Sequence, residues 1–255
     1  MYGFWQWRDY LMDRGLPIVI VGGLLGFLTV APMMPGLHQN IASLSPRVIA
    51  KWGGVDGATA WVIQDFNGMI LRNLLGALVF MGALLAMNGI VANDRKLGYY
   101  RFLFSKPVAP WRYYGQAFVV HWVGYVAAMA LLGLIYGVLV GPVLSVPLLI
   151  VVALMFLTYG GITFALSAAA RWDWLSLVSV TVAASYFWDR YKESHTVIAK
   201  LLYLLPPLHR TSEVYTAVAK GEPLPWHLLE WFAGYGVACF VLGLLVLRFR
   251  RLAIV

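Results

Sequence analysis

The chain has 255 residues, of which 61% are hydrophobic and only 12% are charged. About a quarter of the residues of a soluble globular domain are usually charged, so one soluble core could not bury this much apolar surface. The composition excludes an ordinary soluble protein and indicates a membrane protein solvated largely by lipid. The net charge of +8 would suggest nucleic-acid binding in a soluble protein. Here the placement of the charges is more informative, and we expect no nucleic-acid partner.

Six apolar stretches are long enough to form transmembrane helices, which need about 20 residues each. They are 16–34, 73–92, 115–140, 147–170, 173–189 and 228–247. We therefore expect an all-α, polytopic membrane protein with about six transmembrane helices. No internal repeat or low-complexity linker divides the chain, so residues 1–255 are predicted to form a single domain.

The first stretch could be a signal peptide or a retained helix. Arg8 and Arg14 precede it, as in a signal peptide, but its length is that of a spanning helix. Asp9 adds an acidic residue to the basic segment. Pro32 directly follows Ala31, and a proline is a poor residue beside a cleavage site. We therefore expect a retained first helix.

Small and hydroxyl residues suggest how two of the other stretches pack. The fifth stretch is the shortest and carries Ser176, Ser179, Thr181 and Ser185. Such a helix is predicted to pack inside a bundle rather than against lipid. Gly133 and Gly137 are four residues apart in the third stretch, a spacing that permits close approach of another helix.

The basic residues predict the orientation. Eleven of the 19 Lys and Arg residues lie on the side of the two termini, and eight lie on the opposite side. The contrast is clearer in the short loops, because the loop 93–114 has five basic residues and the loop 141–146 has none. Lys and Arg are enriched in cytoplasmic loops, so both termini are predicted to be cytoplasmic.

Two segments on the outer side are long. Ser45-Pro46 in the first is a typical helix start. In the second, the apolar residues from Val197 to Leu205 recur at helical spacing before Pro206-Pro207. This pattern predicts an amphipathic segment in the membrane interface, or a broken helix that enters and leaves the membrane.

The inner loop 93–115 is the most informative segment. It has a polar start, an aromatic and aliphatic run from Leu97 to Phe104, a turn bounded by prolines, and the pair Trp111-Arg112 before the third stretch. This pattern predicts a short amphipathic helix at the membrane surface. The loop could be an ordinary basic surface loop, or it could be a docking helix for a cytoplasmic partner.

Three features of this loop resemble the permease subunits of type-2 ATP-binding-cassette (ABC) exporters. They are Asp94-x-x-x-Gly98, the run from Phe102 to Val108, and Trp111-Arg112. The segment Gly221-Glu222-Pro223 is similar to the region between helices five and six of that family. The six stretches, the inner termini and the long last outer segment extend the resemblance over most of the chain.

The resemblance implies a permease that forms a dimer with a second copy or a paralogue and binds cytoplasmic ABC ATPase subunits. It implies an amphipathic interface helix over Tyr2 to Asp13 and a coupling helix over about 94–105. The residues that it implies for coupling to the ATPase are Asp94, Arg95, Gly98, Tyr99, Arg101, Phe102, Phe104 and Pro107. By analogy with the family, the first, second and fifth helices would line the centre of the dimer.

The chain has no Gly-x-x-x-x-Gly-Lys-Ser/Thr run, the loop that holds nucleotide phosphates. We therefore expect no enzymatic activity and no cofactor in this chain, with ATP and Mg²⁺ bound by the partner ATPase. The function implied is export of a hydrophobic or amphipathic cargo across the bacterial cytoplasmic membrane.

Other functions are less well supported. Asp56-Gly57-x-x-Ala60 is similar to the start of a lipid phosphotransferase signature, but Trp61 replaces its Arg and Asp65 lacks partner carboxylates at helical spacing. His121 is isolated in its stretch, so we expect a packing role, and the other histidines lack metal-ligand spacing. An ion-coupled carrier would need more charges inside the spans. A non-transporting assembly or scaffold protein remains open.

Overall fold

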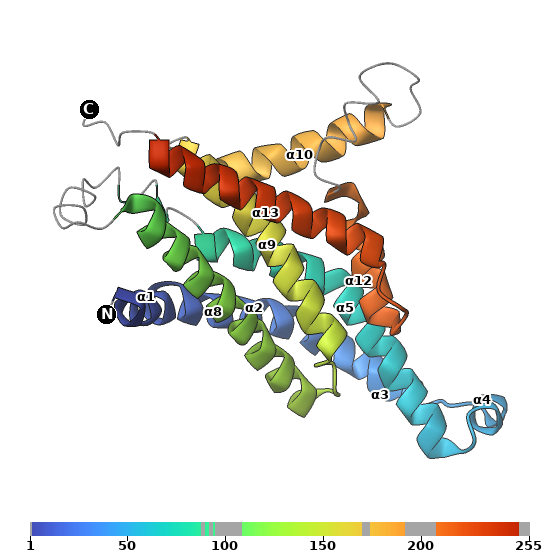
Figure 1. The fold of residues 1–255 in the computed structure, drawn as a ribbon. Coiled ribbons are helices and arrows are strands. Elements are labelled where there is room, and N and C mark those ends of the chain that lie inside the picture. The colour runs from blue at the N-terminus through green and yellow to red at the C-terminus, as the bar shows by residue number, and fades with distance from the viewer. Residues whose placement is uncertain are drawn as a thin grey trace.

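The computed structural model describes residues 2–87, 90, 91, 94, 109–169, 174–191 and 208–249. All regular structure in these ranges is helical, and they contain no strand (Figure 1). Five segments among them are long and apolar enough to cross a membrane: Gly3–Ala42, Val55–Met87, Pro110–Leu139, Val146–Ala169 and Trp226–Phe249. The predicted all-α membrane protein is thus confirmed, whereas the count of six transmembrane helices stays a prediction.

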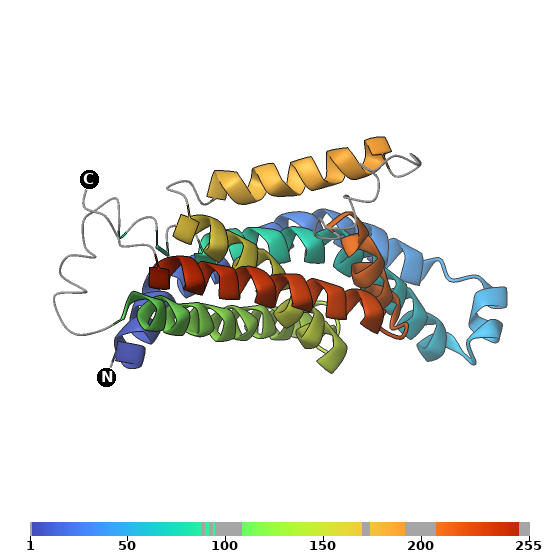
Figure 2. The same cartoon turned by 45° about the horizontal axis from the view of Figure 1, so that its top comes forward.

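The first segment is one continuous helical path whose turn type changes along its length. It consists of α1 (Tyr2–Tyr10), a π-helical turn (Leu11–Gly15), α2 (Leu16–Val30), a 3₁₀ turn (Ala31–Met33) and α3 (Met34–Ala42). Pro17, Pro32 and Pro35 each lie in the first turn of one of these elements, where a missing N–H is tolerated. Figure 2 shows that α1 leaves the line of α2 at an angle.

The second segment is longer than the sequence predicts. Ser45 caps α4 (Pro46–Lys51) as expected, because its hydroxyl accepts a hydrogen bond from the Val48 N–H at 3.4 Å. The next helix, α5, then extends over Val55–Met87, although we expected the span to begin at residue 73. Part of the extra length is covered by another helix, because α12 (Thr211–Lys220) packs against the middle of α5, where Gly68 and Gly76 lie beside Ala219 and Tyr215.

The centre of the bundle is α9 (Val146–Ala169), which lies between α8 (Pro110–Leu139) and α13 (Trp226–Phe249) (Figure 1). Gly161 of α9 and Gly236 of α13 bring the two backbones together, since a Cβ on Gly161 would overlap the Gly236 carbonyl oxygen. The Thr158 hydroxyl also donates to the Phe232 carbonyl at 2.9 Å. The close helix contact therefore lies between α9 and α13.

The spacing of Gly133 and Gly137 permits a helix contact, but within the described part of one chain another segment lies there. A Cβ on Gly133 would lie 3.3 Å from the Leu144 side chain, and one on Gly137 would lie 3.7 Å from Pro142. These two glycines therefore lie against the turn that follows α8 rather than against another helix.

The helix α10 (Trp174–Tyr191) matches the predicted fifth stretch in position and length. Within one chain it does not pack inside the bundle, which corrects the expectation drawn from its hydroxyl residues. It contacts α9 and the 3₁₀ turn η3 (Leu208–Arg210) and lies along one side of the other helices (Figure 2). Val182 and Tyr186 are 62% and 63% exposed on its outer face.

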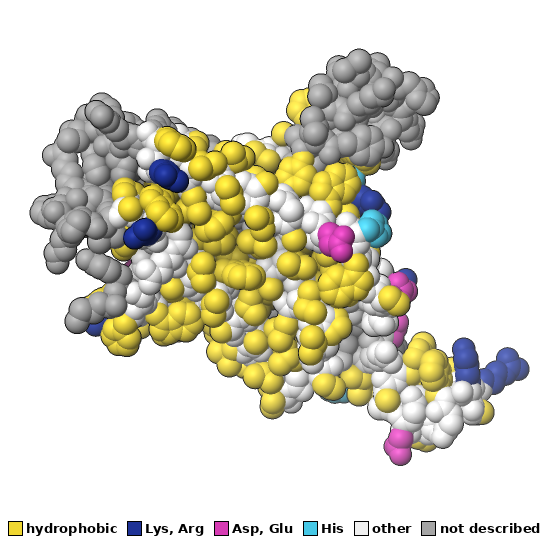
Figure 3. Space-filling view, in the orientation of Figure 1, with side chains coloured by type: hydrophobic (Ala, Val, Ile, Leu, Met, Phe, Trp, Pro, Cys, Tyr) yellow, Lys and Arg dark blue, Asp and Glu magenta, His cyan; other side chains and the backbone are white. Residues whose placement is uncertain are grey.

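One face of the molecule has an apolar middle and charged ends. Figure 3 shows hydrophobic side chains over the middle of this face, Lys and Arg towards the left, and Lys, Arg, Asp and Glu towards the right. The start of α1 and the end of α13 lie at one end, which we call the loop end (Figure 1). α5 also ends there and α8 begins there, whereas α4 lies at the opposite end, which we call the far end. This division is the one expected for helices that cross a membrane.

Candidate functional site

The site predicted from the sequence is the loop between α5 and α8, and the structure describes its beginning and its end. Of the eight residues predicted to couple to the ATPase, only Asp94 is described. Arg95, Gly98, Tyr99, Arg101, Phe102, Phe104 and Pro107 lie outside the described residues, as do most of the predicted coupling helix and the outer run Val197 to Leu205.

Asp94 is attached to the first turns of α8. Its carboxylate accepts a hydrogen bond from the Tyr114 hydroxyl at 3.0 Å, and Tyr114 is itself buried. Burial raises the pKa of the Asp94 carboxyl above its usual range, and the hydrogen bond from Tyr114 opposes part of that effect. A hydrogen bond to an ionised carboxylate is stronger than a hydrogen bond between two neutral groups. This contact therefore ties the start of the loop to α8.

A second contact ties the same stretch of chain to α9. The Val91 N–H donates to the Ser167 hydroxyl at 3.3 Å, and both residues are buried. Ser167 lies in the last turn of α9, two residues before the described part of that helix ends. No sequence pattern marks Ser167, because a single Ser near a helix end is common and its partner lies 76 residues away.

The N-terminal helix converges on the same place. Gln6 of α1 donates through Nε2 to the Tyr113 carbonyl of α8 at 3.2 Å. Arg14 donates through Nη1 to the Leu85 carbonyl in the last turn of α5 at 3.1 Å, where helix carbonyls lack intrahelical partners. We call Gln6, Arg14, Asp94, Tyr114 and Ser167 the anchor cluster. It joins α1, α5, the loop, α8 and α9 at the loop end.

Tyr10 fixes α1 against α8. Its ring occupies the space that a side chain at Gly124 would fill, because a Cβ there would overlap the Tyr10 ring. The ring also meets His121 edge-on, with 5.0 Å between the ring centroids. His121 Nδ1 lies 2.6 Å from the Ala117 carbonyl oxygen of its own helix, so the predicted packing role of this histidine is confirmed.

The outer face of α1 has the character predicted for an amphipathic helix. Phe4 and Trp5 are exposed, and the Arg8 guanidinium lies 4.9 Å from the centre of the Trp5 ring. Gln6 and Tyr10, on the other face, are buried against α8. Exposed aromatic and basic side chains of this kind favour the membrane interface.

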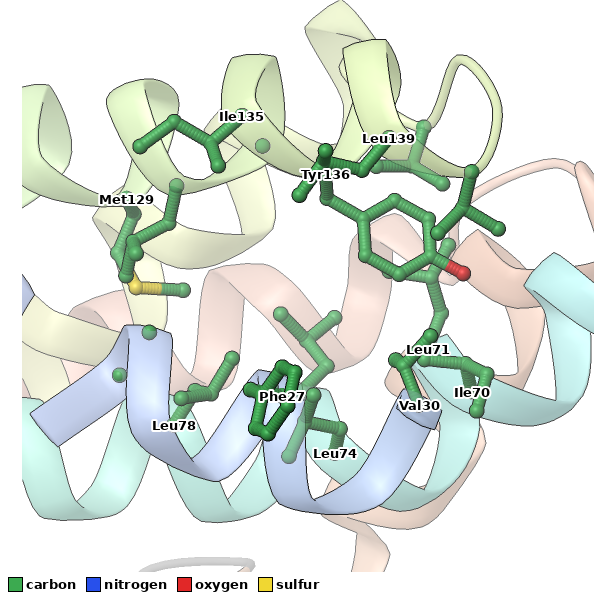
Figure 4. Close-up of a pocket in the computed structure, with 18 of the residues that line it drawn as sticks. Phe27, Val30, Ile70, Leu71, Leu74, Leu78, Met129, Ile135, Tyr136 and Leu139 are labelled. Atoms are coloured by element: carbon green, nitrogen blue, oxygen red, sulfur yellow. The ribbon is translucent and has the colours of Figure 1, made fainter. Parts of the chain in front are cut away.

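The far end contains an apolar cavity instead of polar contacts. It has a volume of about 300 Å³ and is open on one side, between α2, α5 and α8 (Figure 4). Phe27 and Val30 of α2, Leu74 of α5, and Met129 and Tyr136 of α8 contribute to its wall. The Tyr136 hydroxyl donates to Asn67 Oδ1 at 2.9 Å, so the one ring hydroxyl in this wall is paired.

An aromatic stack joins the outer segments. The rings of Trp188 in α10 and His209 in η3 are 3.7 Å apart and nearly parallel. Burial lowers the pKa of His209, the positive charge of Arg210 lowers it further, and Glu213 and Asp189 oppose the shift. Arg210 makes two hydrogen bonds to Glu213, at 2.8 and 2.7 Å, which lower the pKa of the Glu213 carboxyl.

The described residues do not form the site that a lipid phosphotransferase needs. No group of three His, Cys, Asp or Glu side chains among them is placed to hold a metal ion. Asp56 and Asp65 are nine residues apart on α5, about two and a half turns, so they lie on opposite faces of the helix. Two carboxylates in that arrangement cannot share one ion.

Comparison of the chain with protein-family models, with characterised proteins and with solved structures finds no match.

Proposed function

We propose that this chain is the permease subunit of an ATP-driven type-2 ABC exporter, and that residues 1–255 form one permease domain. It moves a hydrophobic or amphipathic cargo across the bacterial cytoplasmic membrane, and a separate cytoplasmic ABC ATPase subunit binds ATP and Mg²⁺. The observation that carries the proposal is the anchor cluster, which ties the start of the predicted coupling loop to α8 and α9.

The packing behind the anchor cluster supports a mechanical role for it. The Trp122 indole N–H of α8 donates to the Ala153 carbonyl of α9 at 2.9 Å. α9 is in turn held against α13 by the close contact at Gly161 and Gly236. A displacement of the loop by a partner would therefore move α8, α9 and α13 together. Coupling between distant sites requires such a rigid element, which both sites can bias.

The direction of the helices supports a sixth membrane crossing at α10. Both α9 and α13 run from the far end to the loop end (Figure 1). The chain between them must return to the far end, and α10 runs back along the bundle. Its 18 residues span about 27 Å, close to the thickness of the hydrocarbon core. With six crossings both termini lie on one side, and the basic residues of the loop favour the cytoplasm for that side.

The exposed face of α10 supports a dimer. Val182, Tyr186 and Phe187 are large apolar side chains without cover in one chain, on a helix that also carries hydroxyl residues. Hydroxyl and small side chains favour contacts between helices within membranes. A second copy of the chain, or a paralogue, would cover this face and satisfy the expectation that this helix packs in a bundle.

Co-purification tests the proposal. The tagged chain is expressed with a candidate ABC ATPase from the same organism, and the complex is isolated in lipid nanodiscs. We expect a stable complex whose ATP hydrolysis rate differs from that of the ATPase alone. The variants Asp94→Asn and Asp56→Asn form a matched pair, since Asp56 is exposed at the far end, and only the first should change the rate.

Two outcomes would contradict the proposal. Folded permease that retains no ATPase would favour the scaffold function that the sequence leaves open. A complex whose hydrolysis rate responds equally to Asp94→Asn and Asp56→Asn would remove the loop from the coupling path.

A further inference from the structure

The apolar cavity at the far end is not used by the coupling proposal, and its surroundings define what could occupy it. Most of its wall comes from α2, α5 and α8, with Leu148 of α9 at one point, and each of these helices belongs to a segment that is long and apolar enough to span a membrane. In a single chain, its open side therefore faces the hydrocarbon of the bilayer. Phe27 and Leu139 at its rim are 67% and 72% exposed, as expected for side chains in contact with lipid.

Missing side chains create the space. Gly23 and Gly26 line the cavity from α2, and a Cβ on either one would meet no atom within 4 Å. Gly22, between α2 and α8, is different, since a Cβ there would come within 2.6 Å of the Leu132 side chain. Gly22 therefore lets the helices approach, whereas Gly23 and Gly26 leave the cavity open beside that contact.

The dimensions suit one hydrocarbon chain. The lining runs along the first segment from Gly22 to Met34, which corresponds to about 18 Å of helix. One leaflet contributes about half of the roughly 30 Å hydrocarbon core, so this length matches a chain in a single leaflet. The volume of about 300 Å³ is about twice that of a cavity that binds benzene.

The polar groups mark the two ends of the site. The cavity wall contains no charged side chain, so nothing in it selects a particular headgroup. The Tyr136–Asn67 hydrogen bond lies towards the far end, and His38 and Gln39 are exposed one turn beyond Met34. A lipid of the leaflet at the far end would therefore place its chain in the cavity and its headgroup near α3.

We propose that this cavity binds one acyl chain of a membrane phospholipid from the leaflet at the far end. The occupant is a phospholipid for two reasons. The cavity opens sideways to the bilayer, whose interior consists of phospholipid chains. Its wall is also apolar throughout, apart from one paired hydroxyl. This proposal does not depend on the exporter function, since it concerns a site remote from the anchor cluster.

Photo-crosslinking tests it. The full-length protein is placed in nanodiscs of phosphatidylethanolamine and phosphatidylglycerol that contain a phospholipid with a diazirine in its acyl chain. After irradiation, labelled peptides are mapped by mass spectrometry. We expect labelling along 22–34, 70–78 and 132–140 to exceed that of the lipid-exposed positions Val237 and Leu242 of α13 by at least about threefold, with either headgroup.

Glycine variants provide the matched controls. Gly26→Leu and Gly23→Leu each place a side chain in the cavity and should reduce its labelling at least about threefold. Gly234→Leu adds the same side chain on α13, where a Cβ also meets nothing, and should leave the cavity labelling unchanged. Size-exclusion chromatography confirms that each variant is folded before labelling, and the wild-type comparison between the cavity and α13 requires no variant at all.

Three results would overturn the proposal. Equal labelling of the cavity and α13 would mean ordinary contact with bulk lipid. The labelling could also be removed by an added amphiphile but not by excess phospholipid. That result would assign the cavity to a cargo. An unlabelled cavity in a protein that elutes as a dimer would assign it to the second copy.

Discussion

The two ends of the bundle are built differently. At the loop end, five polar side chains from four helices and the loop bind backbone or one another, and Tyr10 fills the space beside Gly124. At the far end, α2, α5 and α8 pack around an apolar cavity, and a single described hydrogen bond between side chains, Tyr136 to Asn67, joins two of them. The loop end is therefore held by polar contacts between elements distant in sequence, as the proposed coupling requires, whereas the far end is held by apolar contacts around a cavity.

An effect as large as any below should come from the close backbone contact between α9 and α13. The variant Gly236→Val would drive its side chain into the Leu157 carbonyl, which is backbone and cannot rotate away. We expect a loss of about 3 kcal/mol or more in the free energy of unfolding, at the upper limit for overpacked cores. Thermal melting in detergent measures it. Gly234→Val, two residues away in open space, should cause no loss, and an equal loss in both variants would refute the contact.

Tyr10 tests the tied end. Tyr10→Ala removes the ring that fills the space beside Gly124 and should cost about 3–5 kcal/mol, as for other buried aromatic residues. Tyr10→Phe should be nearly neutral, because the Tyr10 hydroxyl has no hydrogen-bond partner in the described part of the chain. Chemical denaturation of both variants checks this. A large loss in Tyr10→Phe would show that the hydroxyl, rather than the ring, holds α1.

Asp94 predicts a pH dependence at the same end. Its pKa is raised by burial, so the folded protein binds a proton more readily than the unfolded chain. Its contribution to stability should be greatest at or below the ordinary Asp pKa, and it should decline as the pH rises through the raised folded value. The melting temperature of wild type minus that of Asp94→Asn, measured from pH 4 to 8, should fall with increasing pH. A rising difference would contradict the burial of this carboxyl.

The smallest effect should come from the exposed pair Arg210 and Glu213. Glu213→Gln should cost about 0.5 kcal/mol at pH 7, because water screens exposed ion pairs. The pKa of Glu213 is lowered in the folded protein, so this contribution exists above the ordinary Glu pKa and is lost as the pH falls through the lowered value. Melting curves at pH 7 and pH 3 measure it. A loss at pH 7 as large as that of Tyr10→Ala would place this pair in the core.

The apolar stretches predicted the membrane helices because hydrophobic length is a local property of the sequence. The start of α5 at Val55 was missed because residues 55–72 are packed by tertiary contacts, with α12 at Gly68 and with Trp52 at Trp61, that no local pattern predicts. The spacing of Gly133 and Gly137 permits a helix contact, but the turn after α8 lies beside them instead. Spacing identifies a groove on a helix but not the segment that fills it.

The candidate site was predictable only in part. A soft motif predicts Asp94, whereas no motif marks Tyr114 or Ser167 as its neighbours in the cluster. Both become partners of the loop through contacts between residues 20 and 76 positions apart. The cavity could not be foreseen either, because Gly23 and Gly26 create space only where α5 and α8 happen not to fill it.

The central claim, that the loop acts on the bundle through the anchor cluster, is tested most directly by a double-mutant cycle. Asp94→Asn, Tyr114→Phe and the double variant are each purified with the candidate ATPase in nanodiscs, and ATP hydrolysis is compared with that of the ATPase alone. We predict that each single variant still binds the ATPase but reduces the change in hydrolysis rate that the permease causes. The double variant should reduce this change no further than the more severe of the two single variants does. Effects that add in the double variant, or single variants that leave the rate unchanged, would contradict the account.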